Sequence, residues 1–390
     1  MLHVLAAGDP LFSHGIDKIV VLIVIIKTVV TFVLLLVSVL LMIWFERKVN
    51  ADMTNRIGPN RAGPHGVLQT LADGIKFFFK EDLLPDQADK RVFRLAPYLS
   101  ILPAFLAFSI VPIGGVITIG HRTTRLQLAD PPIGILFLLA MSSIAVYGVM
   151  LAGWSSGSKY PLLGSVRASA QMVSYEAALG LSTAAVVLAS GSLAVSDIVS
   201  QQSGSVLNWN LIRLGVVPFV IFLIASTAET NRPPFDLVEA EQELVGGFHT
   251  EYSSVRFALF FLAEFMNTIT MSAIVVTLFL GGPHGPAPHV VTWLWPIVWF
   301  FAKLLVFLFL QVWLRATLPR LRYDQLMDLG WKALIPLSLG WLLILATLRL
   351  NHRWYGVVAG AVGVLAWLTL VRAIDVGRHR VADRELERSR

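Results

Sequence analysis

The segment AETNRPPFDLVEAEQELVGGFHTEYS, residues 228–253, lies between two apolar runs that are each long enough to cross a membrane. Beside one arginine (Arg232) and one histidine (His249), it holds six carboxylates: Glu229, Asp236, Glu239, Glu241, Glu243 and Glu251. A helix is expected from Asp236 onward, because prolines are tolerated where a helix begins but not inside it. That helix would stack like charges on one face, which costs roughly 0.2–0.5 kcal/mol per pair. The segment is therefore either a solvated acidic loop or a functional cluster.

The composition defines the class of protein. Of 390 residues, 56% are hydrophobic and 14% are charged, whereas globular proteins carry about 25% charged residues, so this is an integral membrane protein. The chain has no cysteine, which excludes disulfides and iron–sulfur clusters held by its own thiolates. The histidines lack the spacing of a metal motif, and we expect no removable signal peptide. The net charge of +6 fits basic loops at a membrane and does not indicate nucleic-acid binding.

Apolar runs of about 20 residues predict an all-α, polytopic transmembrane helix bundle with eight to nine spans. The expected spans lie near 17–45, 95–120, 133–153, 168–191, 211–229, 255–281, 290–315, 333–349 and 354–374. Most of the 31 Lys and Arg residues fall on one side, in the connections 46–94, 154–167, 230–256, 315–332 and the tail after 371. The positive-inside rule therefore predicts that these loops are cytoplasmic and that the N-terminus is outside.

The first of these loops begins with ERKVNADMTNRIGPNRAGPHGVLQTLADGIKFFFKED, residues 46–82. Its centre is rich in Gly, Pro and Asn and must turn tightly. Apolar residues then recur at helical spacing from Leu68 to Phe79, with polar residues opposite. This pattern predicts an amphipathic helix over 66–80 that lies at the membrane surface or caps a cavity, with Asp73 facing that cavity. The alternatives are a surface helix of a soluble insert and, for Arg47, a simple basic stop after the first span.

Charged residues also occur inside the expected spans. A carboxylate at the bilayer centre costs about 2.5–3.5 kcal/mol, so Glu176 and Glu264 are either functional or are structural residues kept protonated or hydrogen-bonded. Lys27 and Lys303 rank lower, because a lysine can extend its ammonium group to the membrane surface. The segment RATLPRLRYDQLMDLGWK, residues 315–332, gathers three arginines, which a basic stop would explain by itself.

These loop motifs, together with SYEAALG at 174–180, resemble the quinone-site membrane subunit (the NuoH type) of bacterial respiratory complex I, NADH:quinone oxidoreductase. The resemblance covers residues 17–349 in order. It implies a membrane domain over 1–349 with the eight spans common to the family. The additional span expected at 354–374 and the basic tail, within 350–390, depart from that common core.

The resemblance also implies roles for particular residues. Those matching the lining of the quinone chamber are Arg47, Asp73, Arg232, Glu241, Glu243, Arg320 and Arg322. Those matching the buried carboxylates that lead from the chamber into the membrane arm are Glu176, Glu229 and Glu264, and we add Glu46, Asp236 and Glu239 as candidates for proton coupling. No catalytic residue, metal ligand or redox centre is expected in this chain.

The resemblance implies a place in a larger assembly. Quinone is the expected substrate, and FMN and iron–sulfur clusters are expected in partner subunits. The expected partners are the hydrophilic quinone-module subunits, adjacent small membrane subunits and lipid, within the bacterial plasma membrane. Two alternatives remain open: the membrane anchor of a membrane-bound hydrogenase-type complex, and a stand-alone ion-coupled transporter that uses the intramembrane carboxylates.

Overall fold

The structure is a computed structural model that describes residues 9–12, 15, 17–119, 122–237, 245–286, 291, 293–350, 361 and 372. Its elements follow in chain order: η1 (Pro10–Phe12), α2 (Lys18–Met53), η2 (Pro64–Gly66), α3 (Gln69–Phe79), α4 (Lys90–Phe108), β1 (Val116–Ile119), β2 (Arg122–Arg125), α5 (Gly134–Ser155), α6 (Lys159–Ser190), α7 (Val195–Gln201), η3 (Val206–Asn208), α8 (Asn210–Arg213), α9 (Val216–Glu229), η4 (Gly247–His249), α11 (Ser254–Phe279), α12 (Leu294–Thr317), α13 (Tyr323–Asp328), η5 (Leu329–Leu334) and α14 (Ile335–Leu350).

Among the described residues, seven helical stretches are long and apolar enough to cross a membrane: α2, α4, α5, α6, α11, α12 and the continuous stretch Tyr323–Arg349. α9 is apolar but shorter. Together they match the eight spans expected between residues 17 and 349, so the expected membrane helix bundle is confirmed and the chain is a multi-pass membrane protein. The ninth expected span, 354–374, lies almost entirely outside the described residues.

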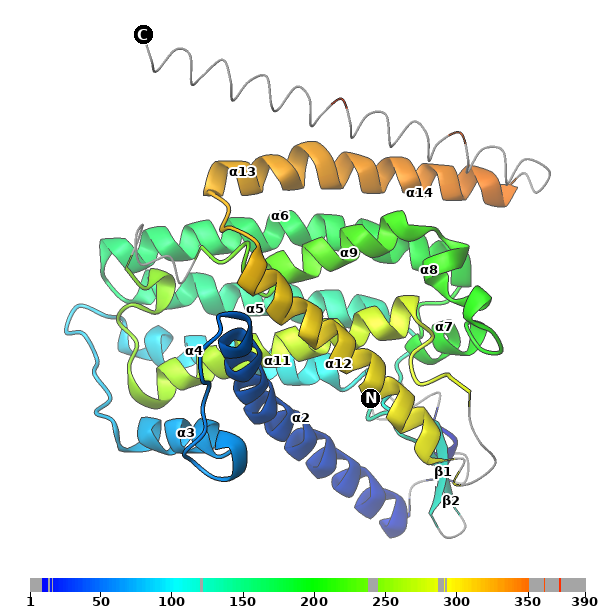
Figure 1. The fold of residues 1–390 in the computed structure, drawn as a ribbon, viewed down its shortest axis with the longest axis horizontal. Coiled ribbons are helices and arrows are strands. Elements are labelled where there is room, and N and C mark those ends of the chain that lie inside the picture. Colours follow the sequence, from blue (N-terminus) through cyan, green and yellow to red (C-terminus); the bar gives the residue numbers. More distant parts are fainter. Residues whose placement is uncertain are drawn as a thin grey trace.

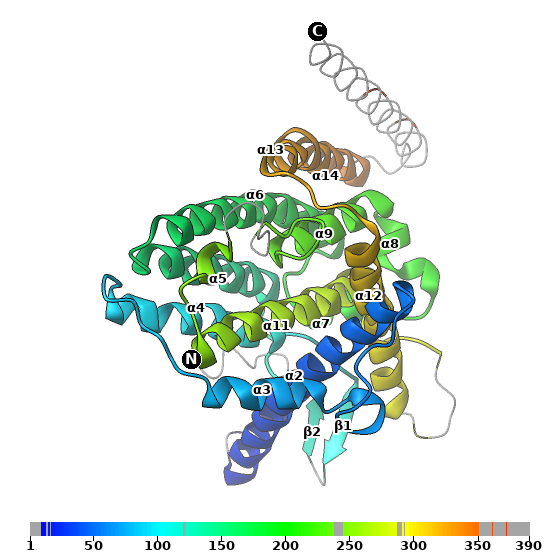
Figure 2. The ribbon, with the colours of Figure 1, turned by 60° about the vertical axis from the view of Figure 1, so that its left-hand side comes forward.

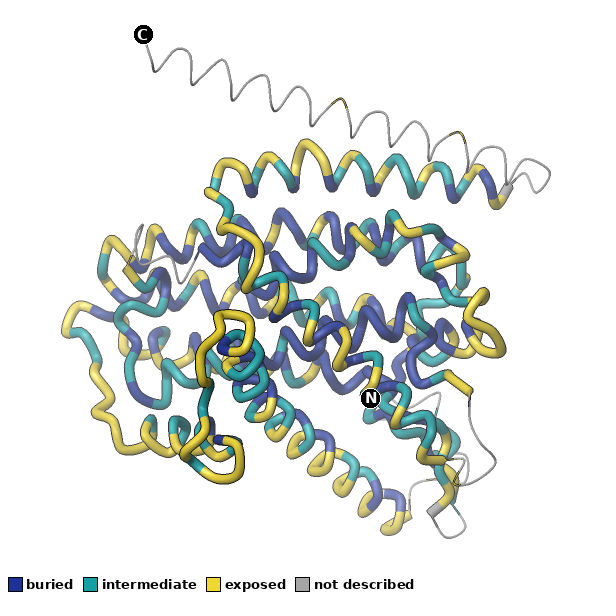
Figure 3. Tube along the Cα trace, viewed as in Figure 1, coloured by how far each residue is buried: buried dark blue, intermediate teal, exposed yellow. Residues whose placement is uncertain are grey.

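The spanning helices are packed in layers (Figures 1 and 2). α4, α5, α6, α9 and α11 run side by side, α2 and α12 cross this group at an angle, and α13 and α14 lie along α6. We call the end of the bundle that carries α3 and residues 230–237 the α3 end, and the end that carries β1, β2, α7 and α8 the hairpin end. α11 is the central helix and is mostly buried, whereas α2 and α14 leave one side exposed (Figure 3). Exposed apolar residues on α2, such as Leu22 and Val30, suit a surface covered by lipid.

One expected span differs from the observed structure. The run 95–120 is not helical throughout, because α4 ends at Phe108 and residues 116–119 form β1, which pairs antiparallel with β2 in the register Val116↔Arg125. Pro112 has no N–H to donate to the carbonyl oxygen of Phe108, so the helix does not continue past this point, and the β-branched residues after Gly114 and Gly115 favour a strand. The sequence pattern detected the apolar character of this segment but not its change of conformation.

The amphipathic helix α3 turns its polar side toward the bundle and its apolar side away from it. Its partly buried side carries Thr70, Asp73 and Phe77, and it contacts α2 and α11. Its apolar side is exposed: Leu68, Leu71, Ile75, Phe78 and Phe79 are 47–87% accessible. The expected helix is present, but within this chain its apolar side does not pack against the bundle.

The turn before α3 brings this helix back beside the end of α2. Gly66 has a φ of 78°, and a Cβ there would collide with the carbonyl oxygen of Pro59, so glycine is required at this position. Trp44 Nε1 donates to the carbonyl oxygen of His65 at 3.0 Å. The turn is thereby fastened to the last part of α2.

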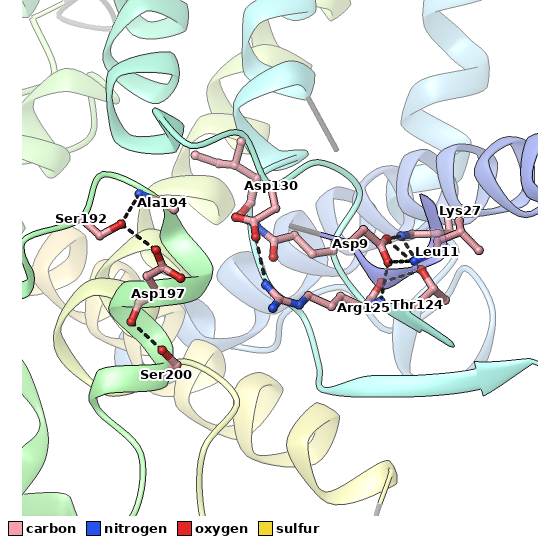
Figure 4. A network of polar contacts seen from close by, with 12 residues as sticks. Asp9, Leu11, Lys27, Thr124, Arg125, Asp130, Ser192, Ala194, Asp197 and Ser200 are labelled. Atoms are coloured by element: carbon pink, nitrogen blue, oxygen red, sulfur yellow. Dashed lines mark hydrogen bonds and ion pairs between the residues drawn. The ribbon is translucent and has the colours of Figure 1, made fainter. Parts of the chain in front are cut away.

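Both intramembrane lysines bond within the chain near the hairpin end. Lys27 Nζ lies 2.8 Å from Asp9 Oδ2 and 3.0 Å from Thr124 Oγ1 (Figure 4). Burial raises the pKa of the Asp9 carboxyl, but hydrogen bonds from Lys27 and Leu11 outweigh it and leave the pKa below its usual value. Lys303 Nζ donates to the carbonyl oxygens of residues 280, 282 and 284 at 2.7–3.0 Å. These lysines fasten loops to helices.

Candidate functional site

The end of α9 places the acidic segment inside the bundle. α9 has 14 residues and is therefore about 21 Å long, shorter than the roughly 30 Å hydrocarbon core of a bilayer. The residues that follow it consequently do not leave the protein: Thr230, Arg232 and Asp236 are all at most 6% exposed. A charged loop held at this depth must satisfy its charges with internal partners.

Arg232 is the centre of those contacts. Its Nη1 donates to the two carboxylate oxygens of Glu46, on α2, at 3.3 and 3.2 Å. Its Nε lies 3.1 Å from Glu264 Oε1, on α11, as an ion pair without hydrogen-bond alignment. The guanidinium carbon is 4.0 Å from the ring centroid of Phe265, a distance at which cation–π attraction is effective. One side chain thus joins three elements.

Arg315, in the last turn of α12, also contacts Glu46 through Nη1. Glu46 therefore has two arginine partners, and Arg232 has two glutamate partners. Two positive and two negative charges balance, which is the condition for burying charged groups. The Nη2 of Arg232 is buried and has no hydrogen-bond partner among the described residues.

The loop that carries Arg232 is fixed by a buried glutamine on α6. Gln171 Nε2 donates to the carbonyl oxygens of Ala228 and Phe235 at 2.8 and 2.9 Å, and Gln171 is fully buried. Asp236 forms an ion pair with Arg320 at 3.1 Å. The described part of the acidic segment, up to residue 237, is therefore a shaped loop; the expected helix from Asp236 onward falls mainly on 238–244, outside the described residues.

A cavity of about 450 Å³ opens beside this charge network. α2, the turn 56–59, α11 and the end of α12 contribute its lining: Ile43, Glu46, Arg47, Asn50, Ala51, Arg56, Ile57, Gly58, Pro59, Phe261, Phe265 and Arg315. The wall is apolar on the α11 side and carries arginines on the other sides. Such a cavity suits a ligand with an apolar body and oxygen acceptors.

At the edge of the cavity, Arg47 bonds to Asp73. Arg47 Nη1 lies 2.5 Å from Asp73 Oδ2, and Gln69 Nε2 donates to Asp73 Oδ1 at 3.1 Å. The side chains of Arg47 and Asp73 are 43% and 35% exposed. The pair links α3 to α2, and Asp73 faces the bundle rather than the outer surface of α3.

The chain of carboxylates continues from Glu264 into the bundle. Glu264 and Glu229 line a second cavity of about 60 Å³. Consecutive serines of α5 then connect two helices, because Ser142 Oγ donates to Glu229 on α9 and Ser143 Oγ donates to Glu176 on α6. Glu46, Glu264, Glu229 and Glu176 thus form a series with polar groups between them.

The structure places the other residues proposed from sequence as follows. Arg320 meets Asp236, but Arg322 is 75% exposed at its side chain and pairs with Asp324, so Arg322 is not brought to the large cavity. Glu239, Glu241 and Glu243 lie outside the described residues. No group of three His, Asp or Glu side chains among the described residues could hold a metal ion.

Several residues of the site were not proposed from sequence: Arg315, Gln171, Ser142 and Ser143. Arg315 stood in an arginine-rich segment that a basic stop could explain, and serines within an apolar helix carry no distinctive signal. Gln171 was detectable in principle, since an amide buried in a span must have partners.

These features define a polytopic membrane protein with a buried arginine–carboxylate network beside an apolar-walled cavity. A family model described as NADH dehydrogenase matches residues 26–346, and the chain belongs to that family. It is 51% identical over 399 residues to the H subunit of the NADH-quinone oxidoreductase of Frankia casuarinae, with 98% of this chain and 85% of the relative covered. It is 52% identical over 378 residues to the corresponding protein of Frankia alni, with 93% and 82% covered. The resemblance drawn from the loop motifs is confirmed.

Proposed function

We propose that the chain works as the subunit of a proton-pumping NADH:quinone oxidoreductase that forms the wall and entrance of the quinone chamber. The observation that carries the proposal is the network of Glu46, Arg232, Glu264 and Arg315 at the edge of the 450 Å³ cavity. Family membership and the names of the curated relatives support the assembly in which it would act.

The cavity has the chemistry that a quinone needs. Ile43, Phe261 and Phe265 offer apolar surface to the ring and tail, and Arg47, Arg56 and Arg315 offer N–H donors to carbonyl oxygens. This chain has no cysteine to hold an iron–sulfur cluster, so the clusters that reduce quinone would belong to partner subunits, where we also place the FMN. The role of this chain is to admit and orient the quinone.

The carboxylate series supplies a means of coupling. Reduction of a quinone to a quinol takes up two electrons and two protons, so the charge beside Glu46 changes during turnover. Interacting carboxylates titrate as a set, and the series Glu46–Glu264–Glu229–Glu176 leads from the cavity to the bundle interior. A change at the cavity can therefore alter the protonation of groups deeper in the bundle.

The experiment uses Glu229→Gln and Glu176→Gln in the assembled complex. Glutamine keeps the shape and hydrogen bonding of glutamate but cannot titrate. We expect normal NADH oxidation with a water-soluble artificial acceptor, and a parallel loss of quinone-linked turnover and vesicle acidification of about tenfold or more. Full pumping in both variants would show that these carboxylates are structural.

The remaining features of the proposal concern the assembly. Partner subunits would cover the α3 end, which we place in the cytoplasm of the bacterium from the distribution of Lys and Arg. The names of the curated relatives favour a quinone oxidoreductase over a hydrogenase-type anchor. Co-purification in mild detergent would distinguish the two by the presence of NADH- and flavin-binding subunits, and activity of the isolated chain in vesicles would favour a stand-alone transporter.

A further inference from the structure

The 60 Å³ cavity between Glu229 and Glu264 also contains a histidine that the proposed route does not use. His249, in η4, lines this cavity together with the two glutamates. η4 packs on α5 and α6 at the α3 end, so His249 lies on the side of the cavity that is nearer the α3 end.

The cavity is polar enough to hold water. Its volume of about 60 Å³ admits a small number of water molecules. Asn231 and Asn267 add amide groups to its wall. Ser100 and Glu229 also line it, and Ser100 Oγ and Glu229 Oε2 are buried without a hydrogen-bond partner among the described residues. Buried polar groups of this kind are normally satisfied by ordered water.

The surroundings of His249 favour the neutral imidazole. Its ring contacts Phe248 and Phe257 edge-on, with centroids 5.1 and 5.2 Å apart. Burial lowers the pKa of His249 to about 4. At neutral pH the ring therefore has one nitrogen that accepts a proton and one that donates a proton, and it does not hold a stable charge.

We propose that His249 relays protons between the α3 end of the bundle and the water in the cavity shared by Glu229 and Glu264. In each transfer one nitrogen takes a proton as the other releases one, and the ring then returns to its first tautomer by rotation or by proton exchange with water. One proton enters and one leaves, and no electron moves. The inference rests on the proposed function, since it supplies the carboxylate route with protons.

The test compares His249→Gln with His284→Gln in the assembled complex. His284 belongs to the loop after α11 at the hairpin end and is outside the cavity lining, so its variant should behave as wild type. In His249→Gln we expect a normal artificial-acceptor rate, a loss of quinone-linked turnover and acidification of about tenfold, and a larger D₂O isotope effect, because proton transfer becomes rate-limiting. Full pumping, or a loss without a change in isotope effect, would overturn the relay.

A second variant separates a relay from a structural role. His249→Gly leaves space beside Phe248 and Phe257, and added imidazole should restore turnover in a concentration-dependent manner. A His249→Gly complex that assembles but is not restored would count against the relay; if it does not assemble, the isotope effect of His249→Gln decides. Glu229→Gln and Glu264→Gln are measured in parallel: if they stop pumping and His249→Gln does not, this inference alone fails. If neither stops pumping, the proposed carboxylate route fails as well.

Discussion

Arg232 and Glu46 are 186 positions apart in the sequence, yet the Arg232 guanidinium donates to both oxygens of the Glu46 carboxylate inside the membrane bundle. The contact exists because α9 ends early and its following loop turns back among α2, α6 and α11. It joins the acidic segment to the first spanning helix at the wall of the large cavity.

Replacing Arg232 by lysine should separate charge from geometry. A lysine keeps the positive charge but cannot contact Glu46 and Glu264 together while covering the ring of Phe265. Loss of one charge-assisted hydrogen bond corresponds to about 1.5–3 kcal/mol, so we expect quinone-linked turnover to fall about tenfold or more at a normal artificial-acceptor rate. Wild-type turnover in Arg232→Lys would show that only the charge matters.

The Arg47–Asp73 pair should affect quinone binding more than stability. Both side chains are substantially exposed, and such pairs contribute about 0.2–1 kcal/mol, so Asp73→Asn and Arg47→Lys should assemble normally. We expect each to raise the KM for quinone, because the pair fixes α3 at the edge of the cavity. Thermal unfolding and quinone kinetics on the same preparation provide the measurement. An unchanged KM in Arg47→Lys would favour the topological role considered for this residue.

Gln171 should act as a positioning residue for the Arg232 loop. Gln171→Leu preserves the approximate volume but removes the hydrogen bonds that Nε2 donates to the carbonyl oxygens of Ala228 and Phe235 and to Asn231 Oδ1, and each such bond contributes about 0.5–1.5 kcal/mol. We expect a lower thermal midpoint together with reduced quinone-linked turnover. Ser169→Ala on the same helix is the control, since the Ser169 hydroxyl is buried without a hydrogen-bond partner among the described residues. Equal losses in both variants would contradict the positioning role.

His249 should make stability depend on pH in the mildly acidic range. Because its pKa is about 4 when folded and about 6.5 when unfolded, the unfolded chain binds more protons between these values, and stability rises with pH across this window. Wild type should therefore lose more of its thermal midpoint between pH 7 and pH 5 than His249→Gln does. Parallel curves for the two proteins would show that His249 is accessible to solvent and titrates normally.

The sequence predicted the membrane helix bundle and several charged residues of the site, but it did not predict which of these residues pair with one another. Arg315, Arg320 and Arg322 have similar surroundings in the sequence. Arg315 reaches Glu46 because α12 continues to Thr317, whereas Arg322 follows an extended stretch and faces outward. Arg320, in the same stretch as Arg322, meets the buried Asp236. Which arginines meet a buried carboxylate therefore depends on where a helix ends and on the path of the chain after it, and helix boundaries are poorly specified by sequence pattern.

The orientation of α3 was undetermined for a different reason. Helical periodicity shows that one side is apolar, but in a membrane protein an apolar side can face lipid as well as a protein core. Polar contacts decided the orientation here, since Asp73 bonds to Arg47 and Ser254 donates to the carbonyl oxygens of Phe77 and Lys80 at the end of α3. Contacts between residues so distant in sequence leave no periodic pattern.

The apolar side of α3 faces away from the bundle, so another apolar surface is expected to cover it. Hydrogen bonds hold its polar side to the bundle, whereas Leu71, Ile75 and Phe78 are open to lipid or to a partner subunit. Asp73 belongs to the same helix and bonds to Arg47 at the edge of the cavity. Whatever covers α3 from outside therefore lies one helix away from the cavity.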